Sequence, residues 1–450
     1  MLIRFVVDNV FSFGAQKEFN MVPNARIRVL PHHKYKFGDT FNFLKMSSIY
    51  GANGAGKSNL IKALSLLQLM VRDAVSPSLF GETKFKLQNN LDDSTQMFAI
   101  EFIEQGTAFY YAVEINKGII ITEELYESGL GIKADKLIFE RKTGADKATS
   151  ITFLKEFEND EKSKVLKEVL KTFVRPNELI FKLIADRCNE YLYLSVAKKA
   201  YGWFSDTLQI ILPNAKPIAL TQRIIVDDDF KKYAENIMCT LNVGITSIST
   251  EKINVKALYN KNQHVENMIK QFEASSERMV HLMEVGGNEV ILVKEENEIF
   301  AKQLKLEHSG NDGIKANFDL NQESDGTIRL LDFIPAFRDV VSKNKVFIID
   351  EIERSIHPLL IKELIRKFSY DDDSKGQLIF TTHESNLLDQ EIFRQDEIWF
   401  AEKDSGGATD LYSLSDFKEH KTIDIRKGYL NGRYGSIPFL ANLHDLNWHE

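Results

Sequence analysis

The sequence has few of the features that mark secreted or membrane proteins. Its 450 residues include only two cysteines, Cys188 and Cys239, which cannot form a disulfide framework. We interpret both as small core residues in a reducing compartment. No uninterrupted apolar run approaches the roughly 20 residues needed to span a bilayer. The opening segment, MLIRFVVDNVFSF, lacks a basic leader and predicts a strand rather than a signal peptide. We therefore expect a cytoplasmic protein with no membrane partner.

An excess of positive charge is also missing. The chain has 57 basic and 65 acidic residues, so its net charge of −8 does not suit a nucleic-acid coat. Internal repeats and sustained heptads do not occur, which argues against a long coiled-coil arm. Hydrophobic residues make up 43% of the chain, enough to bury a sizeable core. The length favours two lobes or one domain with a large insertion.

The pattern of apolar residues divides the chain into three parts. Alternation from Leu2 to Met21 predicts an antiparallel hairpin, and the runs from Met97 to Leu125 predict a meander of strands. Helical periodicity dominates from Thr149 to Met279. We predict an N-terminal half over residues 1–148, a helical insertion over 149–285, and a C-terminal half with a βα pattern over 286–450.

The strongest motif is the glycine-rich segment from Gly51 to Ser58, between a predicted strand and a predicted helix. It fits G-x-x-x-x-G-K-[ST], in which backbone N–H groups and the helix N-terminus face phosphate oxygens. Lys57 is expected to reach the β- and γ-phosphates, and Ser58 to bind Mg²⁺. The alternative is a glycine turn with an exposed lysine. The nucleotide-binding candidates are Gly51, Ala52, Asn53, Gly54, Ala55, Gly56, Lys57, Ser58 and Asn59.

Two acidic residues follow a fully apolar strand in the C-terminal half. Val346–Ile349 leads into Asp350 and Glu351. One carboxylate could hold hydrated Mg²⁺ and the next could orient a water for attack on the γ-phosphate. A P-loop alone does not distinguish kinases, GTPases, helicases and ATP-driven machines. The acidic pair, which by itself could be a polar turn, favours the machines that hydrolyse the nucleotide.

A further buried strand, at residues 377–381, delivers His383 at its carboxyl end. An imidazole there could contact the γ-phosphate and the attacking water. The alternative is an ordinary surface or core histidine.

A second candidate anion site lies at the start of a predicted helix. It consists of Ser324, Asp325, Gly326 and Thr327. Taken alone, this segment is more typical of a plain Ser/Thr helix cap.

Together these motifs resemble the α/β ABC-type P-loop ATPase head shared by the SMC, Rad50, RecF and OLD-like families, with a mixed sheet and an antiparallel N-terminal lobe. The segments Asn9–Phe13, Asp350–Pro358 and Gly432–Pro438 are especially similar to stand-alone bacterial ATPases of the OLD-like group. The resemblance covers about residues 1–130 and 310–440. It implies Walker A at Gly51–Ser58 and a signature at Ser324–Thr327.

The resemblance also implies a mechanism. Two copies of the chain would sandwich two ATP molecules, each bound by Walker A of one copy and by Ser324 and Gly326 of the other. Ser58 and Asp350 would hold Mg²⁺, Glu351 would be the general base, and His383 would sense the γ-phosphate. The family's D-loop corresponds to Ser355 and His357, although His357 could equally belong to a helix start. Gln88 is a weak candidate for the glutamine found between the two lobes.

Three functional hypotheses follow. The first is an ATPase that acts as the sensor of an anti-phage or abortive-infection system and controls a separate effector, a nuclease or toxin, because no second catalytic constellation is evident. The second is a RecF-like repair ATPase that binds DNA, with Lys162, Lys164, Lys167 and Lys171 as candidate phosphate contacts; their alternative is a solvated helix face. The third is an oligomeric scaffold that ATP stabilises with little turnover. A transporter motor fits less well than these three.

Overall fold

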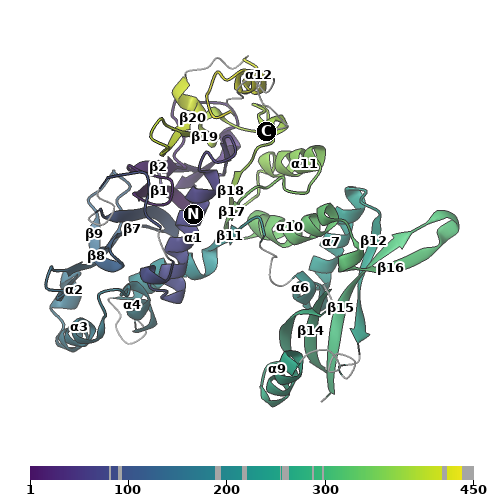
Figure 1. Ribbon diagram of the computed structural model, residues 1–450, viewed down its shortest axis with the longest axis horizontal. Helices are drawn as coiled ribbons and strands as arrows, with labels where there is room; N and C mark the ends of the chain where they lie inside the picture. Colours follow the sequence, from purple (N-terminus) through teal and green to yellow (C-terminus); the bar gives the residue numbers. More distant parts are fainter. Residues whose placement is uncertain are drawn as a thin grey trace, which may run out of the picture. The chain divides into compact units, whose positions relative to one another are not determined.

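The computed structural model describes residues 1–80, 83–89, 94–187, 194–214, 220–253, 255, 263–285, 288–295, 298–417 and 423–437. It divides into two compact units, shown in Figure 1. Unit 1 comprises residues 1–213, 339–352 and 362–450, and unit 2 comprises 214–338 and 353–361. Among the described residues, no helix is both long enough and apolar enough to cross a membrane.

An antiparallel sheet forms the first layer of unit 1. Its strand order is β10-β9-β8-β7-β6-β1-β2. The predicted hairpin and meander are both confirmed, because β1 pairs with β2 and β6, β7 and β8 pair in succession. The strands of this sheet are β1 (Leu2–Asp8), β2 (Lys17–Asn20), β6 (Gln96–Glu104), β7 (Thr107–Asn116), β8 (Ile119–Glu127), β9 (Lys136–Thr143) and β10 (Thr149–Phe153).

A largely parallel sheet forms the second layer of unit 1, in the order β11-β17-β18-β5-β19-β20. Only β20 runs antiparallel to its neighbour. With its parallel and antiparallel strands and its helices, unit 1 has a mixed α/β fold, as predicted. The strands are β5 (Met46–Tyr50), β11 (Leu208–Ile211), β17 (Val346–Ile349), β18 (Gln377–Thr381), β19 (Ile398–Lys403) and β20 (Thr409–Ser413).

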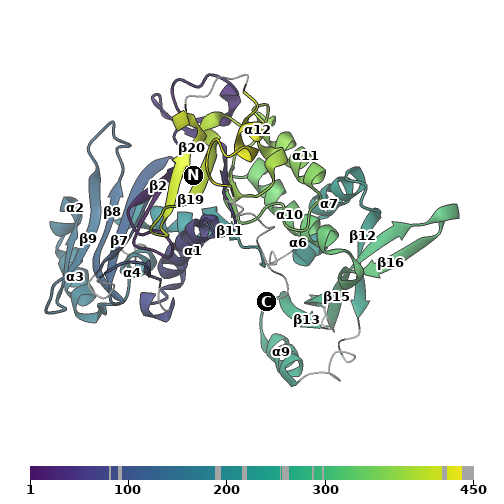
Figure 2. The same ribbon diagram turned by 45° about the horizontal axis from the view of Figure 1, so that its top comes forward.

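Helix α1 (Lys57–Asp73) packs into one apolar core with residues of both sheets (Figure 2). Its apolar side chains Leu60, Leu64, Leu67 and Val71 recur at helical spacing and are all buried. The remaining elements of unit 1 are β3 (Lys34–Phe37), β4 (Phe41–Leu44), α2 (Lys155–Glu158), α3 (Glu161–Phe173), α4 (Phe181–Arg187), α5 (Ser195–Gly202), α12 (Ile425–Leu430) and the short helical turns η1 (Pro31–His33), η2 (Pro77–Phe80), η5 (Trp203–Thr207), η8 (Ser385–Leu387), η9 (Gln395–Glu397) and η10 (Leu414–Phe417).

Unit 2 contains a second antiparallel sheet, in the order β12-β15-β14-β13, with β16 paired to the end of β15. Its strands β14 and β15 lie at the start of the segment predicted as the C-terminal half. The elements that lie wholly in unit 2 are α6 (Leu220–Val226), α7 (Asp228–Thr240), β12 (Ile245–Ile253), α9 (Gln263–Ala274), β13 (Met279–Val285), β14 (Asn288–Glu295), β15 (Glu298–Ser309), η6 (Asn311–Gly313), β16 (Lys315–Asp319) and η7 (Leu320–Gln322). The division between the units falls inside α10 (Asp325–Ser342) and α11 (Pro358–Ser369).

The compact units do not follow the boundaries predicted from the sequence. The segment predicted as a helical insertion, 149–285, also contains β10, β11, β12 and β13. Residues up to 213 belong to unit 1, because β11 pairs with β17 in the parallel sheet and β10 pairs with β9. Segments α2 to α5 are helical as expected, but buried side chains from each of them belong to the same apolar core as the two sheets, so they are part of unit 1 rather than a separate domain.

Cys239, interpreted from the sequence as a core residue, is exposed. It lies in the last turn of α7, and its thiol donates to the carbonyl oxygens of Ile245 and Thr246. At the end of α3, Phe173 is 75% exposed, although Leu166 and Leu170 at helical spacing before it are buried. Cys188 and Pro438 lie outside the described residues.

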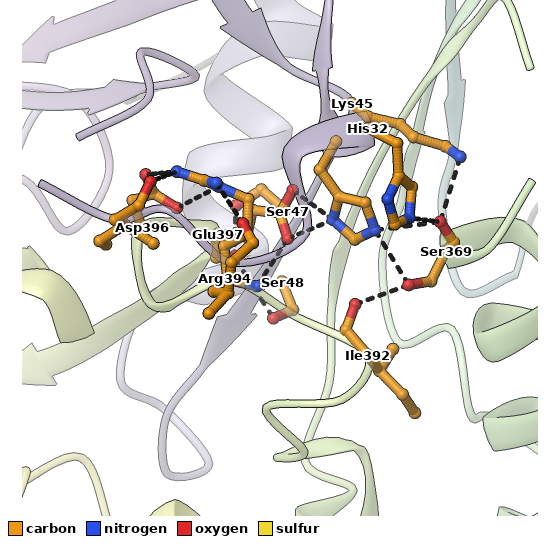
Figure 3. A network of polar contacts seen from close by, with 12 residues as sticks. His32, Lys45, Ser47, Ser48, Ser369, Ile392, Arg394, Asp396 and Glu397 are labelled. Atoms are coloured by element: carbon orange, nitrogen blue, oxygen red, sulfur yellow. Dashed lines mark hydrogen bonds and ion pairs between the residues drawn. The ribbon is translucent and has the colours of Figure 1, made fainter. Parts of the chain in front are cut away.

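A buried polar network fixes the amino end of β5, the strand that leads into the P-loop (Figure 3). The imidazole of His33 contacts both carboxylate oxygens of Glu397 at 2.9 Å, and neither side chain is exposed. Burial raises the pKa of Glu397, although the contact with His33 opposes the shift. The backbone carbonyl of Glu397 accepts a hydrogen bond from Ser47 at 2.9 Å. This network therefore links the amino end of β5 to η9, the turn that leads into β19.

Candidate functional site

The P-loop follows β5, whose five residues are all buried. Gly56 has a φ of +110° and precedes the first residue of α1, Lys57. A Cβ at this position would lie 2.1 Å from the Thr409 hydroxyl oxygen. That hydroxyl donates to the carbonyl of Ala55 at 2.9 Å and contacts the hydroxyl of Ser12 at 2.8 Å. Glycine is required here because the loop packs directly on β20.

The side chain of Lys57 lies over its own loop. Its ammonium group donates to the carbonyls of Gly51 at 2.7 Å and Ala52 at 3.2 Å, and it lies 3.0 Å from Nε2 of His383. Only 5% of Lys57 is exposed. Lys57 and His383, which lie 326 positions apart in the chain, are therefore neighbours.

The acidic pair, Asp350 and Glu351, lies at the carboxyl end of β17. This strand pairs with β18, which in turn pairs with β5, the strand that leads into the P-loop. The hydroxyl of Ser58 donates to Oδ1 of Asp350 at 3.1 Å, so the two predicted Mg²⁺ ligands are in direct contact. Asp350 is 1% exposed, whereas Glu351 is half-buried. Parallel strands place their carboxyl ends at one sheet edge, which is where open α/β sheets bind ligands. The structure thus brings together the predicted P-loop, the acidic pair and His383.

The predicted signature lies in unit 2, at the start of α10. The Ser324 hydroxyl accepts a hydrogen bond from the Thr327 N–H at 3.2 Å, so it caps the helix, as its simpler interpretation expected. A Cβ on Gly326 would lie 2.6 Å from the carbonyl oxygen of Ser355, the candidate D-loop residue of the same unit. The signature glycine and the D-loop serine are therefore in close contact. Asp325 is the first residue of α10.

The weaker candidates, Gln88 and the lysines of α3, make contacts with other polar side chains. Gln88 donates to the side-chain oxygen of Asn9 at 2.5 Å, at the end of β1. On α3, Lys167 forms an ion pair with Glu158 at 2.6 Å, and Lys171 pairs with its neighbour Glu168. These pairs favour the interpretation of α3 as a solvated face rather than a phosphate-binding surface.

A scan against family models matches this chain to the family described as AAA domain, putative AbiEii toxin, type IV toxin–antitoxin system, over residues 46–203 and 248–389. The match covers more than half of the chain and includes Walker A, the acidic pair and His383. The chain belongs to this family. ATPases of this AAA type bind ATP together with Mg²⁺, which agrees with the P-loop prediction.

Solved structures similar to this AAA-domain protein include SMC heads. The SMC head domain from Thermotoga maritima is 11% identical, with 92% of this chain and 98% of that chain covered and a TM-score of 0.39. An SmcHead bound to the C-winged helix domain of ScpA is 11% identical, with coverage of 93% and 99% and a TM-score of 0.41. An Smc head with an extended coiled coil, bound to the C-terminal domain of ScpA derived from Pyrococcus furiosus, is 13% identical, with coverage of 96% and 99% and a TM-score of 0.43. A search of curated proteins found no match.

Sequence analysis missed two hydroxyl residues of the AAA-domain site. Thr409 supports the P-loop from β20, and Thr381 contacts the acidic pair from β18. Thr381 stands two positions before His383 at the end of a buried strand, where a polar side chain is unusual. That placement is a signal in the sequence, but only the histidine was singled out from it.

The pKa of His383 is held below its ordinary value, first by burial and then by the positive charge of Lys57. The imidazole is therefore neutral at neutral pH. We expect Lys57→Met to raise the pKa of His383, while burial still keeps it below that of a solvated histidine. An NMR pH titration, with the signal assigned by its loss in His383→Gln, measures this shift. An unchanged or lower pKa would show that the charge of Lys57 does not act on the imidazole.

Proposed function

We propose that this AAA-domain protein binds ATP with Mg²⁺ at the P-loop edge of unit 1 and hydrolyses it. The observation that carries the proposal is the convergence of Lys57, Ser58, Asp350, Glu351 and His383 on adjacent strand ends. Each residue type matches one requirement of phosphoryl transfer to water: phosphate binding, metal binding, a base and a hydrogen-bonding group near the γ-phosphate.

Ser58 and Asp350 would hold Mg²⁺. In the part of the chain that the structure describes, no cluster of three or more His, Cys, Asp or Glu side chains could form a metal site. Magnesium does not need one, because it keeps several waters and binds through one or two protein groups and the substrate phosphates. When bound, it neutralises charge on the phosphate oxygens. The 3.1 Å contact between the Ser58 hydroxyl and Asp350 supports this pair as its ligands.

Glu351 would accept a proton from the attacking water, and His383 would donate a hydrogen bond to a γ-phosphate oxygen. A neutral imidazole suits that role because its protonated nitrogen is a donor, while its other nitrogen can accept a hydrogen bond from the water. Lys57 would exchange its carbonyl partners, Gly51 and Ala52, for phosphate oxygens.

We further propose that two copies of the chain close over two ATP molecules, with Ser324 and Gly326 of each copy facing the other's nucleotide. The contact between Gly326 and Ser355 supports this, because it groups the two segments that the ABC-type resemblance assigns to the dimer interface. ATP binding would then control a separate toxin or nuclease in an anti-phage, abortive-infection system. The family description, with its putative AbiEii toxin and type IV toxin–antitoxin system, supports that role.

Lys57→Ala tests the nucleotide site. We expect it to weaken ATP binding about 10- to 100-fold, because a charge-assisted contact to phosphate is lost, while circular dichroism shows an intact fold. Titration of Mg-ATP followed by calorimetry measures the affinity. Lys62→Ala, on an exposed face of α1, is the matched control and should bind normally. Equal affinity of Lys57→Ala and wild type would contradict the P-loop assignment.

The link to defence is tested in cells. The chain, expressed with the product of its adjacent reading frame, should protect a bacterial culture from at least one phage in a panel, and Lys57→Ala should abolish that protection. Protection that survives the substitution would separate defence from ATP binding. No protection by the wild type would remove the anti-phage role and leave the ATPase proposal untouched.

A further inference from the structure

Thr381 is the last residue of β18, and its side chain is completely buried. In the parallel pairing of β17 with β18, Ile349 lies opposite Phe380. The next residues along the two strands are Asp350 and Thr381, which places the threonine directly beside the acidic pair. A buried hydroxyl is stable only if it forms hydrogen bonds.

The Thr381 hydroxyl makes two such bonds, one to each member of the acidic pair. It donates to Oδ1 of Asp350, and it accepts the backbone N–H of Glu351 at 2.8 Å. The backbone carbonyl of Thr381 also accepts the N–H of Ile352 at 3.1 Å. A hydroxyl offers one donor and two acceptor sites, so a single side chain can do both. Among residues of this size, only serine shares that ability.

The bond to Glu351 acts on an unusual stretch of backbone. Glu351 has a φ of +52°, in the left-handed region that non-glycine residues seldom adopt. The direction of its side chain follows from this conformation, and the N–H held by Thr381 is one of the contacts that maintain it. Such conformations persist only where the surroundings enforce them.

The bond to Asp350 acts on the proposed metal ligand. Oδ1 of Asp350 accepts two hydrogen bonds, one from the Ser58 hydroxyl at 3.1 Å and one from the Thr381 hydroxyl on β18. Two donors that arrive from α1 and β18 restrict rotation of the carboxylate. Partners that orient a ligating carboxylate commonly affect metal affinity.

We propose that Thr381 is a positioning residue for ATP hydrolysis, with one hydroxyl that orients both the magnesium-binding carboxylate of Asp350 and the general base Glu351. The inference rests on the proposed function, because it assumes that these carboxylates act on Mg-ATP. Thr381 itself would not contact the nucleotide. Its effect would pass through the two residues that it holds.

Three single variants of the full chain test the proposal. Thr381→Val keeps the shape of the side chain and removes both bonds. We expect it to lower kcat about 10- to 100-fold and to raise the Mg²⁺ concentration needed for half-maximal ATP binding. Thr381→Ser keeps the hydroxyl and should restore both values. Thr207→Val is the matched control: it removes a buried hydroxyl that bonds Glu104 at 2.8 Å, before the amino end of β11.

A double variant separates positioning from general loosening of the fold. If Thr381 acts on hydrolysis by orienting Glu351, Thr381→Val should add little to the loss of kcat already caused by Glu351→Gln. The same double variant should still need a higher Mg²⁺ concentration for half-maximal ATP binding than Glu351→Gln alone, because the Thr381 contact with Asp350 is lost in either background. Urea unfolding of every variant provides the measure of stability.

The proposal is overturned if Thr381→Val keeps the wild-type kcat and Mg²⁺ requirement, or if Thr381→Ser is as impaired as Thr381→Val. It is also overturned if Thr207→Val, at equal loss of stability, lowers kcat equally. If the wild type releases no phosphate, the hydrolysis proposal fails by itself. The Mg²⁺ dependence of ATP binding then still decides whether Thr381 orients Asp350.

Discussion

Glu351→Gln is expected to lower phosphate release by about 10²- to 10⁴-fold, the usual effect of removing a general base. The amide has nearly the same shape as the carboxylate but cannot take a proton from water. Lys57, Ser58 and Asp350 are unchanged, so ATP affinity should stay close to that of the wild type. The variant should therefore accumulate with ATP bound and, if two copies close over the nucleotide, as dimers.

Single-turnover phosphate release and sedimentation with saturating Mg-ATP measure these two results. Glu363→Gln changes an exposed carboxyl on α11 and is the matched control. A cycling ATPase and an ATP-stabilised scaffold differ here, because the scaffold should behave nearly the same with either residue. Unchanged phosphate release would exclude Glu351 as the base. A Glu351→Gln protein that remains a single protomer with Mg-ATP would contradict the dimer.

The local motifs were predictable because each one depends on residues that are close together in the sequence. Each motif also follows a buried strand: these are the P-loop Gly51–Ser58, the pair Asp350 and Glu351, and His383. Parallel strands bring their carboxyl ends together, so the three motifs meet. The meander of the antiparallel lobe was predictable for a similar reason, since the apolar runs of β6, β7 and β8 follow one another along the chain with short connections.

Features that depend on long-range pairing were not predictable. The four residues of β11 are too few to show a period, and their place in the sheet depends on pairing with β17, more than 130 positions away. For that reason, unit 1 extends to residue 213 rather than ending at the predicted boundary after residue 148. Thr409 was missed because a lone hydroxyl has no sequence pattern, and the unusual place of Thr381 at the end of a buried strand does not reveal what its hydroxyl binds. Its role appears only when its partners, such as Asp350 or Ala55, are beside it in space.

A mixture of Ser324→Arg and Lys57→Ala chains is expected to recover activity that neither variant has alone. Arginine at the start of α10 would disrupt the cap and occupy the space in front of Gly326, and alanine at position 57 would remove the phosphate contact. In a mixed dimer, one site combines Lys57 of the first chain with Ser324 of the second, and both are intact. The other site contains both substitutions.

Random exchange of chains would make half of the dimers mixed, each with one intact site of two, so recovery should approach roughly a quarter of wild-type phosphate release. The double variant Lys57→Ala/Ser324→Arg, mixed with Lys57→Ala, is the control, because no pairing of these chains restores a site. Recovery only in the first mixture requires that each nucleotide is bound by two chains. If exchange of chains is verified with a labelled subunit and no activity returns, the signature does not act across a dimer, and Ser324 serves only as the cap of α10.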